Sequence, residues 1–440
     1  MKIFLSVILL FLLLNCSFDN KTGIWKNSNQ VDVDKRDRFA DFEKLYTIEK
    51  SFDSIIAPDN NLKISIDPIK SNLKWLDEYF QDSNNLDNFS YKNLNQLIFK
   101  SKRLSRHKIN SKLFFEDSHV IIADDKGNII VYSVAKKKIV FKYNFYKKKI
   151  KKIKKNLNII IEKNIIFIGD NLGYLYALNY INGKLLWAKN YKIPFRSNLK
   201  ILKNTIVLSD INNSLHFINK LNGEKLKSIP TEETILKNNF FNSLASIKDS
   251  IFYLNTYGSL YSINNNGQIN WFLNLKQSLD ENSSNLFFSN PIALHQDKLI
   301  VSSDPYLYIF NSNTGAAISK IAISSIFKPI VSGKNIFLIT KDNLLVCLNL
   351  DTGSIIYSVE INQEIANYLK TKKKSINIKS MALLNDNLFL FLNNSFLIQF
   401  SVEGKVKNID KLPNKLGSLP IFIKDSIIYL NNKNKLIIIN

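Results

Sequence analysis

The stretch that decides the fold runs from Ile159 to Trp187 and reads IIIEKNIIFIGDNLGYLYALNYINGKLLW. Short apolar runs in it are separated by polar turn residues, and the last turn is Asn182-Gly183. Asn-Gly between apolar runs is the strongest short-range signal for a β-hairpin. The stretch therefore predicts consecutive antiparallel strands, the last of which ends with a tryptophan.

The same frame recurs along the chain. We take as marker the residue that ends the third run, Asn179 in the stretch above. The markers stand 38 to 52 residues apart, at Ser133, Asn179, Asn219, Asn264, Asn311, Asn349, Ser401 and Asn440. Six copies then turn through a residue that accepts positive φ without a Cβ clash, namely Gly183, Gly223, Gly267, Gly315, Gly353 and Gly404. Short strands at such a period are typical of propeller blades, so we predict an all-β, eight-bladed β-propeller of four-stranded antiparallel blades. A β-sandwich fits the periodicity but does not explain eight copies in one frame.

The ends of the chain predict how the ring closes. The eighth copy stops at Asn440, after its third strand, and an unpaired edge would remain. The run at residues 96–100, just before the first copy, has the apolar and aromatic character of an outer strand. We therefore predict that this N-terminal strand closes the last blade.

The N-terminus has the pattern of a lipoprotein signal. Lys2 precedes an apolar run of signal-peptide length, which ends at Leu13-Leu14-Asn15-Cys16. This resembles a bacterial lipobox, which implies acylation of Cys16, for instance with palmitate; the alternative is an ordinary signal peptide with an incidental cysteine. We predict a signal peptide at 1–15, a flexible lipid-anchored tether at 16–38, an irregular segment at 39–95 and the propeller at 96–440. Ser17 favours the outer membrane over the inner membrane.

Composition narrows the classes of partner. The net charge of +23 and the pI near 9.6 fit either an anionic partner or general enrichment in lysine. The densest basic runs, 147–155 and 370–374, fit a lipid surface, an acidic partner or a solvated junction, and nucleic-acid binding is not expected of an exported protein. With two cysteines, neither a disulfide framework nor a cysteine zinc site is expected. The four histidines indicate neither a metal site nor a nucleophile–base pair.

The pattern Gly-x-Leu-Tyr-Ala-Leu-Asn, followed by Asn-Gly-x-x-x-Trp, runs from Gly173 to Trp187 and resembles the PQQ-type propeller repeat. Together with the lipobox, the eight copies are similar to the BamB family, the propeller lipoproteins of the outer-membrane β-barrel assembly (BAM) machinery. The resemblance implies a scaffold that is not an enzyme and has no cofactor, on the periplasmic face of the outer membrane. It implies binding to the POTRA domains of a BamA-like barrel, and unfolded outer-membrane proteins as clients.

Two connections are longer than blade closure needs, at residues 228–243 and 276–290, and both belong on one face of the ring. Apolar side chains flanked by charge suit the core of an interface. The candidate partner-binding residues are Ile235, Leu236, Lys237, Phe240, Phe241, Asp280, Glu281, Phe287 and Phe288. The alternative is that the paired phenylalanines begin the core of the next inner strand.

A quinoprotein dehydrogenase, which holds PQQ and Ca²⁺ in the central funnel, is the alternative class. Its members commonly carry a vicinal cysteine pair, which this chain lacks. Asp170, Asp210, Asp304 and Asp342 end second strands, which predicts turn chemistry rather than one convergent site. A periplasmic binding module of other specificity is the remaining alternative.

Overall fold

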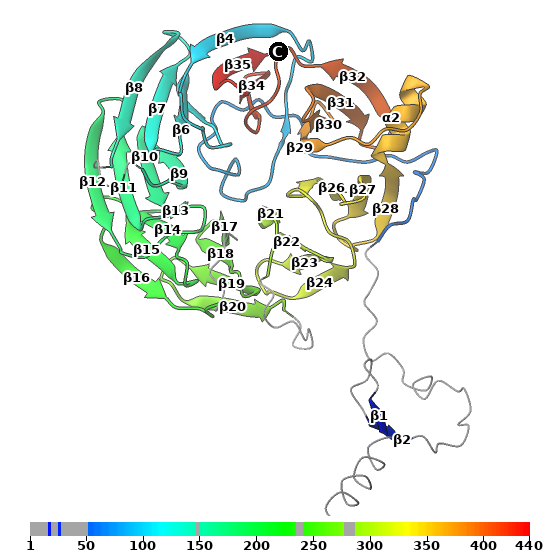
Figure 1. The fold of residues 1–440 in the computed structure, drawn as a ribbon, viewed down its shortest axis with the longest axis horizontal. Helices are drawn as coiled ribbons and strands as arrows, with labels where there is room; N and C mark the ends of the chain where they lie inside the picture. Colours follow the sequence, from blue (N-terminus) through cyan, green and yellow to red (C-terminus); the bar gives the residue numbers. More distant parts are fainter. Residues whose placement is uncertain are drawn as a thin grey trace, which may run out of the picture. The chain divides into compact units, whose positions relative to one another are not determined.

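The computed structural model describes residues 16–18, 25–27, 52–146, 150, 152–234, 241–276 and 287–440. The chain divides into two units, Met1–Lys50 and Ser51–Asn440. In the first unit, β1 (Cys16–Phe18) and β2 (Trp25–Asn27) form an antiparallel pair. The second unit is a ring of eight sheets arranged around an axis (Figure 1). The predicted eight-bladed β-propeller is therefore confirmed.

Each blade is a meander whose first strand lies nearest the axis. Blades 1 to 4 comprise β5 (Phe114–Glu116), β6 (His119–Ala123), β7 (Asn128–Ser133), β8 (Lys138–Asn144); β9 (Leu157–Glu162), β10 (Ile165–Asp170), β11 (Tyr174–Asn179), β12 (Lys184–Asn190); β13 (Lys200–Leu202), β14 (Thr205–Ser209), β15 (Leu215–Asn219), β16 (Lys225–Ile229); and β17 (Ser243–Ile247), β18 (Ser250–Leu254), β19 (Ser259–Asn264), β20 (Ile269–Asn274).

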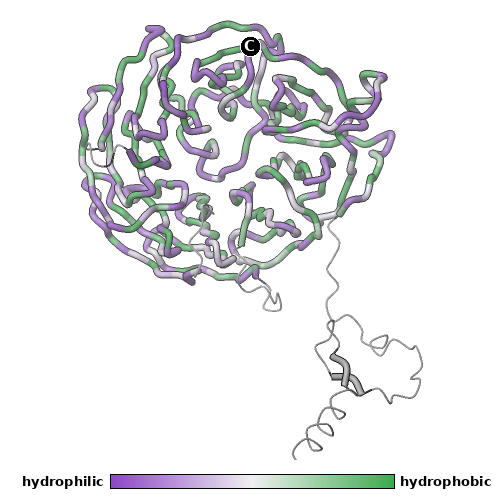
Figure 2. Tube along the Cα trace, in the orientation of Figure 1, coloured by the Kyte–Doolittle hydropathy of each residue, from purple (hydrophilic) through white to green (hydrophobic). Residues whose placement is uncertain are grey.

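The same order continues around the ring. Blades 5 to 8 comprise β21 (Ala293–His295), β22 (Lys298–Ser303), β23 (Tyr306–Asn311), β24 (Ala317–Ile321); β25 (Ile330–Ser332), β26 (Asn335–Ile339), β27 (Leu344–Asn349), β28 (Ile355–Glu360); β29 (Ile378–Leu384), β30 (Asn387–Leu392), β31 (Phe396–Ser401), β32 (Val406–Lys411); and β33 (Ile421–Ile423), β34 (Ser426–Leu430), β35 (Lys435–Ile439), β4 (Leu97–Arg103). Figure 2 shows hydrophobic stretches in the strands and hydrophilic stretches at the turns between them.

The repeated markers fall at one structural position. Seven of the eight are the last residue of a third strand, and Asn440 follows β35 directly. At Asn219 the backbone carbonyl accepts the N–H of Gly223 at 2.9 Å, and the side-chain oxygen accepts the N–H of Leu221 at 2.9 Å. Gly223 has a φ of 71°. In blades 2 to 6 the hairpin to the outer strand is thus closed by an asparagine and a left-handed glycine, which explains why both recur. Blade 1 has Ser133 and Lys137 at these positions, and blade 7 has Ser401 and Gly404.

Aromatic side chains on outer strands join neighbouring blades. Trp187 of β12 donates its indole N–H to the carbonyl of Lys220 in the next blade at 2.9 Å. Trp271 of β20 makes the equivalent bond to Ser312 at 2.9 Å. Each ring also lies against the hairpin glycine of that next blade. The aromatic residue that ends the motif in the sequence is therefore a contact between blades.

The last blade closes as predicted. β4, from before the first blade, pairs antiparallel with β35 and is the outer strand of blade 8 (Figure 1). An additional strand was not predicted: β3 (Asn88–Phe89) pairs parallel with β29, so blade 7 has five strands.

The helix α2 (Ile361–Leu369) connects blade 6 to blade 7. It ends at Lys370, whose φ of 52° and backbone N–H close the last turn. None of the helices in the described part of the chain is long and apolar enough to cross a membrane. Residues 62–66 contribute Leu62, Ile64 and Ile66 to the periphery of the core of blades 6 and 7.

Candidate functional site

The axis of the propeller is filled by the chain's own residues 72–89, which we call the axial segment. Figure 1 shows this part of the chain inside the ring. It bonds to the innermost strand of every blade, in the order of the blades around the ring. The series begins at blade 8, where Asn72 Nδ2 donates to Phe422 O at 2.9 Å. It passes to blade 1, where Trp75 and Phe115 exchange both backbone hydrogen bonds, at 2.7 and 2.9 Å.

The series continues through the other six blades. Its next five bonds, for blades 2 to 6, run from Ile161 N–H to Leu76 O (2.9 Å), Lys200 Nζ to Asp77 Oδ2 (2.7 Å), Ser246 N–H to Asp82 O (2.8 Å), Leu294 N–H to Ser83 O (2.9 Å) and Asn85 Nδ2 to Val331 O (2.7 Å). The series ends with β3 beside β29 in blade 7. Because these bonds satisfy inner-strand groups that would otherwise face the axis, the segment is part of the fold.

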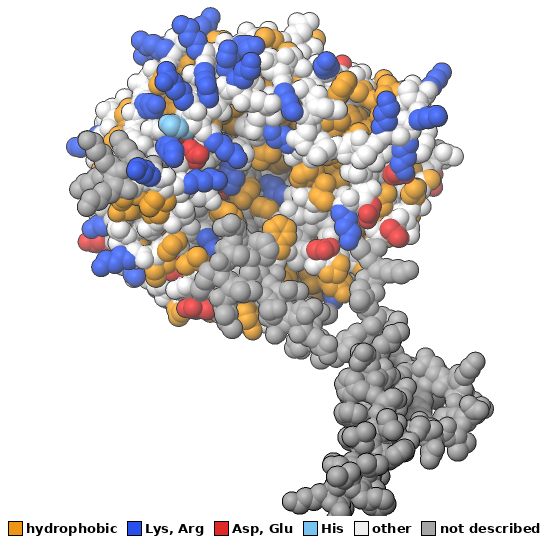
Figure 3. Space-filling view, viewed as in Figure 1, with side chains coloured by type: hydrophobic (Ala, Val, Ile, Leu, Met, Phe, Trp, Pro, Cys, Tyr) orange, Lys and Arg blue, Asp and Glu red, His pale blue; other side chains and the backbone are white. Residues whose placement is uncertain are grey.

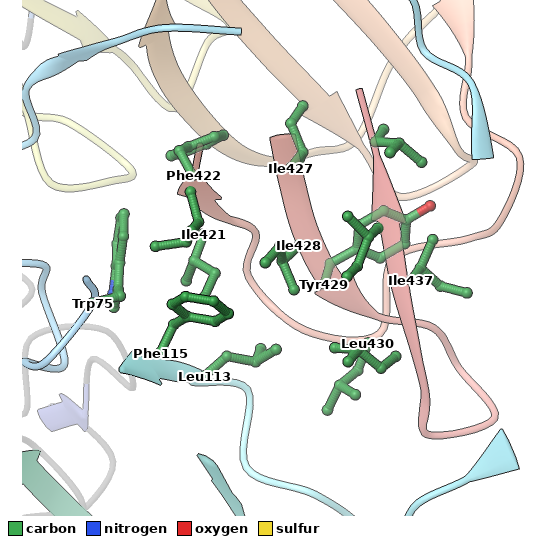
Figure 4. Packing of buried hydrophobic residues seen from close by; sticks show 14 of the residues in the cluster. Trp75, Leu113, Phe115, Ile421, Phe422, Ile427, Ile428, Tyr429, Leu430 and Ile437 are labelled. Carbon is green, nitrogen blue, oxygen red and sulfur yellow. The ribbon is translucent and has the colours of Figure 1, made fainter. Parts of the chain in front are cut away.

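Aromatic packing holds the axial segment in place. Trp75 is 5% exposed, and its ring centroid lies 4.8 Å from that of Phe80 and 5.8 Å from that of Phe89. Figure 4 shows Trp75 facing Phe422 and Ile421 of blade 8. Phe80 has a φ of 93°, a conformation that side chains of this size adopt only when their surroundings impose it.

Two buried ion pairs join the axial segment to blades. Lys200 and Asp77 are 0% and 4% exposed at their side chains, with Nζ and Oδ2 2.7 Å apart. Glu78 pairs with Lys112, which precedes blade 1. Burial raises the pKa of Glu78 above its ordinary value, although the Lys112 charge opposes this. Burial lowers the pKa of Lys112, but the charges of Glu78 and Tyr79 and the hydrogen bonds to both together outweigh burial and raise this pKa above its ordinary value.

This arrangement does not fit a quinone cofactor with its Ca²⁺. The axial segment occupies the space in which such a cofactor would lie. Two cavities border the segment, one of about 230 Å³ and one of about 410 Å³. Among the described residues, no group of three or more histidine, cysteine or acidic side chains is placed to hold a metal ion.

The connection at residues 228–243 rises from a buried polar network between blades 3 and 4. Arg196 Nη2 donates to Asn213 Oδ1 at 2.7 Å, and Asn242 N–H donates to Arg196 O at 3.0 Å. Asn242 Oδ1 in turn accepts the N–H of Thr256 at 3.0 Å. All four residues are buried. Burial lowers the pKa of Arg196, and nearby Tyr253 and Asp210 oppose that shift.

Glu232 holds the start of the same connection. Its Oε2 accepts the hydroxyl of Tyr261 at 2.7 Å and the side-chain N–H of Asn255 at 3.3 Å. Burial acts to raise the pKa of Glu232, but the hydrogen bonds from Tyr261, the backbone, Ser259 and Asn255 together outweigh burial and bring the pKa below its ordinary value. Thr231 Oγ1 donates to Asn213 O at 2.7 Å. The connection is therefore supported by blades 3 and 4 together.

Three of the predicted partner-binding residues are described. Phe241 and Phe288 are 41% and 55% exposed. Phe287 instead packs against the core between blades 4 and 5, and its N–H donates to Thr256 O at 3.0 Å. Phe287 is therefore a core residue, as the alternative for the phenylalanine pair expects, and the partner-binding role of exposed Phe241 and Phe288 stays a prediction. The others, Ile235, Leu236, Lys237, Phe240, Asp280 and Glu281, lie outside the described residues.

The aspartates predicted to share one turn position divide into two kinds. Asp170 Oδ1 accepts the backbone N–H groups two and four residues later, at 2.9 and 2.8 Å, and Asp210 makes the same bonds. Asp304 instead accepts a serine hydroxyl from the connection to the next blade. In blade 6 the position belongs to Thr340, not to Asp342. The equivalence was therefore wrong for Asp304, whose turn is shorter, and for Asp342, which lies two residues after the equivalent position in a turn of the same length.

A Ser-His-Asp chain, which the sequence analysis did not predict, lies in blade 3. His216 Nε2 lies 2.8 Å from Asp210 Oδ2, and Ser228 Oγ lies 3.1 Å from His216 Nδ1. Acyl transfer also needs donors placed for the oxyanion in a site that excludes water. Ser228 lies on the exposed outer strand β16. Because water solvates that position, we interpret these Ser-His-Asp hydrogen bonds as a structural contact between strands and not as a catalytic site.

Basic side chains gather over blades 8 and 1. Figure 3 shows Lys and Arg side chains concentrated on the upper part of one face, and hydrophobic and basic side chains at its hollow centre. Within the first basic run, Lys152 and Lys154 are exposed. Lys155 is buried, with Nζ 2.7 Å from Ile153 O and 4.8 Å from the ring centroid of Tyr146. The described part of this run is therefore not uniformly solvated.

Comparison with known sequences gives two kinds of relative. The family model described as outer membrane protein assembly factor BamB matches residues 152–359, which span blades 2 to 6. An uncharacterised protein of Rickettsia conorii is 24% identical over 358 residues, covering 78% of this chain and 73% of that protein. One of Rickettsia prowazekii is 22% identical over 346 residues, covering 76% of this chain and 80% of that protein.

Solved structures share the fold. BamB from Moraxella catarrhalis superposes with a TM-score of 0.60 at 13% identity, covering 78% of this chain and 98% of that chain. Quinohemoprotein alcohol dehydrogenase from Comamonas testosteroni gives 0.61 at 8% identity, covering 83% and 80%. These likenesses show the fold alone. They confirm the β-propeller fold, and the family model shows that residues 152–359 are similar to BamB.

Proposed function

We propose that this chain is a non-enzymatic scaffold lipoprotein of the outer-membrane β-barrel assembly machinery. It stands on the periplasmic face of the outer membrane, attached by a lipid on Cys16. The face that carries the connections 228–243 and 276–290 binds the POTRA domains of a BamA-like barrel and so aids the insertion of outer-membrane proteins.

The observation that carries the proposal is the way the first of these connections is supported. A buried network centred on Arg196 and Asn242 fixes its base to two blades. Phe241, which adjoins Asn242 of this network, is exposed to solvent, and Phe288 is exposed at the next connection. Loops held by a rigid scaffold, with exposed aromatic residues, are what a protein–protein interface uses. The match to the BamB family model includes both connections.

The filled axis supports a scaffold rather than an enzyme. In a quinoprotein dehydrogenase the funnel around the axis has to admit both cofactor and substrate. Here residues 72–89 occupy that space and bond to all eight blades. This supports the proposal that the similarity to alcohol dehydrogenases extends to the blades and not to the reaction.

The lipid attachment is tested separately. Cells that express the Cys16→Ser variant are grown with an alkyne-labelled palmitate, and the membrane fraction is probed for label on this protein. We expect label on the wild type alone, with the variant released into the periplasmic fraction. Equal membrane retention of the variant would contradict the lipid anchor.

The partner is tested by affinity capture of the full chain from detergent-solubilised envelopes. We expect recovery of a BamA-like barrel, with Phe241→Glu and Phe288→Glu each reducing the yield at least about tenfold, since truncating a central interface aromatic costs about 2 kcal/mol or more. Phe396→Glu, which changes a 37% exposed phenylalanine on blade 7, is the matched control and retains the barrel. Capture of the barrel by all three variants alike would reject this interface, and quinone absorbance in the purified chain would reject the scaffold.

A further inference from the structure

A cavity of about 230 Å³ lies at one mouth of the propeller axis, between the axial segment and five blades. Its walls come from the axial segment and from the starts of the inner strands of blades 1, 5, 6, 7 and 8. An apolar cavity of about 150 Å³ accommodates benzene, and drug-sized ligands need about 300 Å³ or more. The volume therefore suits a single ring with one or two substituents.

Most of the wall is apolar and aromatic. Trp75 forms one side, with the ring of Phe422 at 6.1 Å between centroids in an edge orientation. Phe327, Met381 and Leu113 are among the other apolar residues of the lining. Figure 4 shows Trp75, Phe422 and Leu113 around this part of the axis. Flat apolar walls of this kind favour a planar, apolar body.

A lysine in the same wall, Lys328, has neither a counter-ion nor a full set of hydrogen-bond acceptors among the described residues. Lys328 Nζ donates to the backbone carbonyls of Tyr79, at 3.3 Å, and Asn84, which leaves one of its three N–H bonds. Within the described part of the chain no carboxylate lies in ion-pair contact with Lys328, whereas Lys112 has Glu78. An ammonium group that is partly buried without a counter-ion favours an anion beside it.

Two oxygen atoms in the wall also lack partners. Glu78 Oε2 is buried without a hydrogen bond in a side chain that is 4% exposed, although its other oxygen meets Lys112. Ser380 Oγ is likewise buried and unpaired. Buried polar atoms nearly always have a hydrogen-bond partner. These two oxygen atoms can therefore accept hydrogen bonds from a bound ligand. Lys379, the remaining lysine of the wall, donates to Leu416 O at 2.8 Å.

We propose that this cavity binds a small aromatic carboxylate that also carries a hydroxyl group. The carboxylate accepts from Lys328, the ring lies among Trp75, Phe327 and Phe422, and the hydroxyl donates to Glu78 Oε2. This site is separate from the loop face and does not depend on the scaffold role. Failure of one leaves the other in place.

Charge makes binding depend on pH. Burial, with the nearby charge of Lys200, lowers the pKa of Lys328 to about 7, and Asp77 opposes this. The other titratable groups of the wall are Glu78, Tyr79, Lys112 and Lys379. Because the carboxylate binds the protonated lysine, affinity falls about tenfold per pH unit above about pH 7.

Titration calorimetry on the full chain tests the site, with 4-hydroxybenzoate as the probe. We expect a saturable Kd between about 10 µM and 1 mM, which is reasonable for a ligand of this size. Benzoate lacks the hydroxyl and 4-hydroxybenzamide lacks the charge, so each binds at least about tenfold more weakly. Lys328→Met reduces the affinity for 4-hydroxybenzoate at least tenfold, to near that of the amide.

Two further variants separate binding from folding. Lys152→Met removes an exposed lysine elsewhere and leaves the affinity unchanged. Leu419→Trp enlarges a 38% exposed side chain of the cavity wall, so it abolishes binding of all three probes with little change in Tm. No saturable binding up to about 10 mM would overturn the proposal. So would equal affinities of the wild type and a folded Lys328→Met variant.

Discussion

Trp187 and Gly223 lie against each other across the interface between blades 2 and 3. A Cβ added to Gly223 would stand 2.5 Å from Cε3 of the indole. The indole N–H meanwhile donates to Lys220 O in the same hairpin at 2.9 Å. Trp271 and Gly315 form the equivalent pair between blades 4 and 5. The glycine therefore serves the turn of its own blade and the packing of the blade before it.

Replacing Gly223 tests this double role. Gly223→Ala introduces a side chain at a φ of 71° and into the tryptophan ring. We expect the free energy of unfolding in urea to fall by about 2–3 kcal/mol, because left-handed strain and overpacking add. Leu221→Ala, at a 74% exposed position of the same hairpin, is the control and changes it by less than about 0.5 kcal/mol. A fall no larger than that of the control would reject the contact.

Ring closure predicts the effect of shortening the chain. Deleting residues 430–440 removes β35, the strand between β34 and β4. Because blade 8 joins blades 7 and 1, we expect one loss of structure over the whole propeller rather than fraying of one blade. Near-ultraviolet circular dichroism during heating measures this. An unchanged cooperative transition in the truncated chain would contradict it.

The Asp77–Lys200 pair predicts non-additive effects. Lys200→Met alone leaves Asp77 buried without its counter-ion, and we expect a loss of about 3–5 kcal/mol. Asp77→Leu combined with Lys200→Met recovers a large part of that loss, since an apolar pair carries no desolvation cost. Urea unfolding of the single and double variants gives the coupling energy. Additive losses would show that the two charges do not interact.

Lys328 predicts a pH dependence of stability. Its folded pKa of about 7 lies below the unfolded value of 10.5, so the unfolded chain binds more protons between these values. Stability of the wild type relative to Lys328→Met therefore rises with pH over this window, by up to about 1.4 kcal/mol per unit. Urea titrations of both proteins from about pH 7 to pH 9 check the sign. A parallel pH dependence of the two proteins would exclude a shifted Lys328.

The repeat was predictable from sequence because its turn chemistry is local. Asn219 and Gly223 form one hairpin with bonds inside five residues, and the same pair recurs around the ring. Closure by a strand near residue 98 was predictable as well, because a three-stranded last copy leaves one edge to fill. β3 was not predictable, since two residues carry no periodic pattern.

The axial segment left no comparable signal. Its contacts join residues 72–89 to partners tens to hundreds of positions away, and Asn84 and Asn85 read as ordinary loop residues. One feature of the sequence could have indicated this segment. It is an irregular stretch, rich in asparagine and aromatic residues, that precedes repeats whose inner strands need hydrogen-bond partners on the axis. Exposed aromatic residues at the two long connections were predictable, as Phe241 and Phe288 show among the described residues. It was not predictable that Phe287 packs against the core whereas Phe288 is exposed. The local direction of the backbone decides this for adjacent side chains, and the sequence does not show that direction.

Propellers typically have four to eight blades, and the number of repeats sets the circumference of the ring. Residues 72–89 contact each inner strand once and in order. The length of this segment therefore matches a ring of eight blades. A related propeller with seven or nine blades would need a different axial segment as well as a different number of repeats. The family around this chain should therefore vary its outer loops freely while its unit count stays constant.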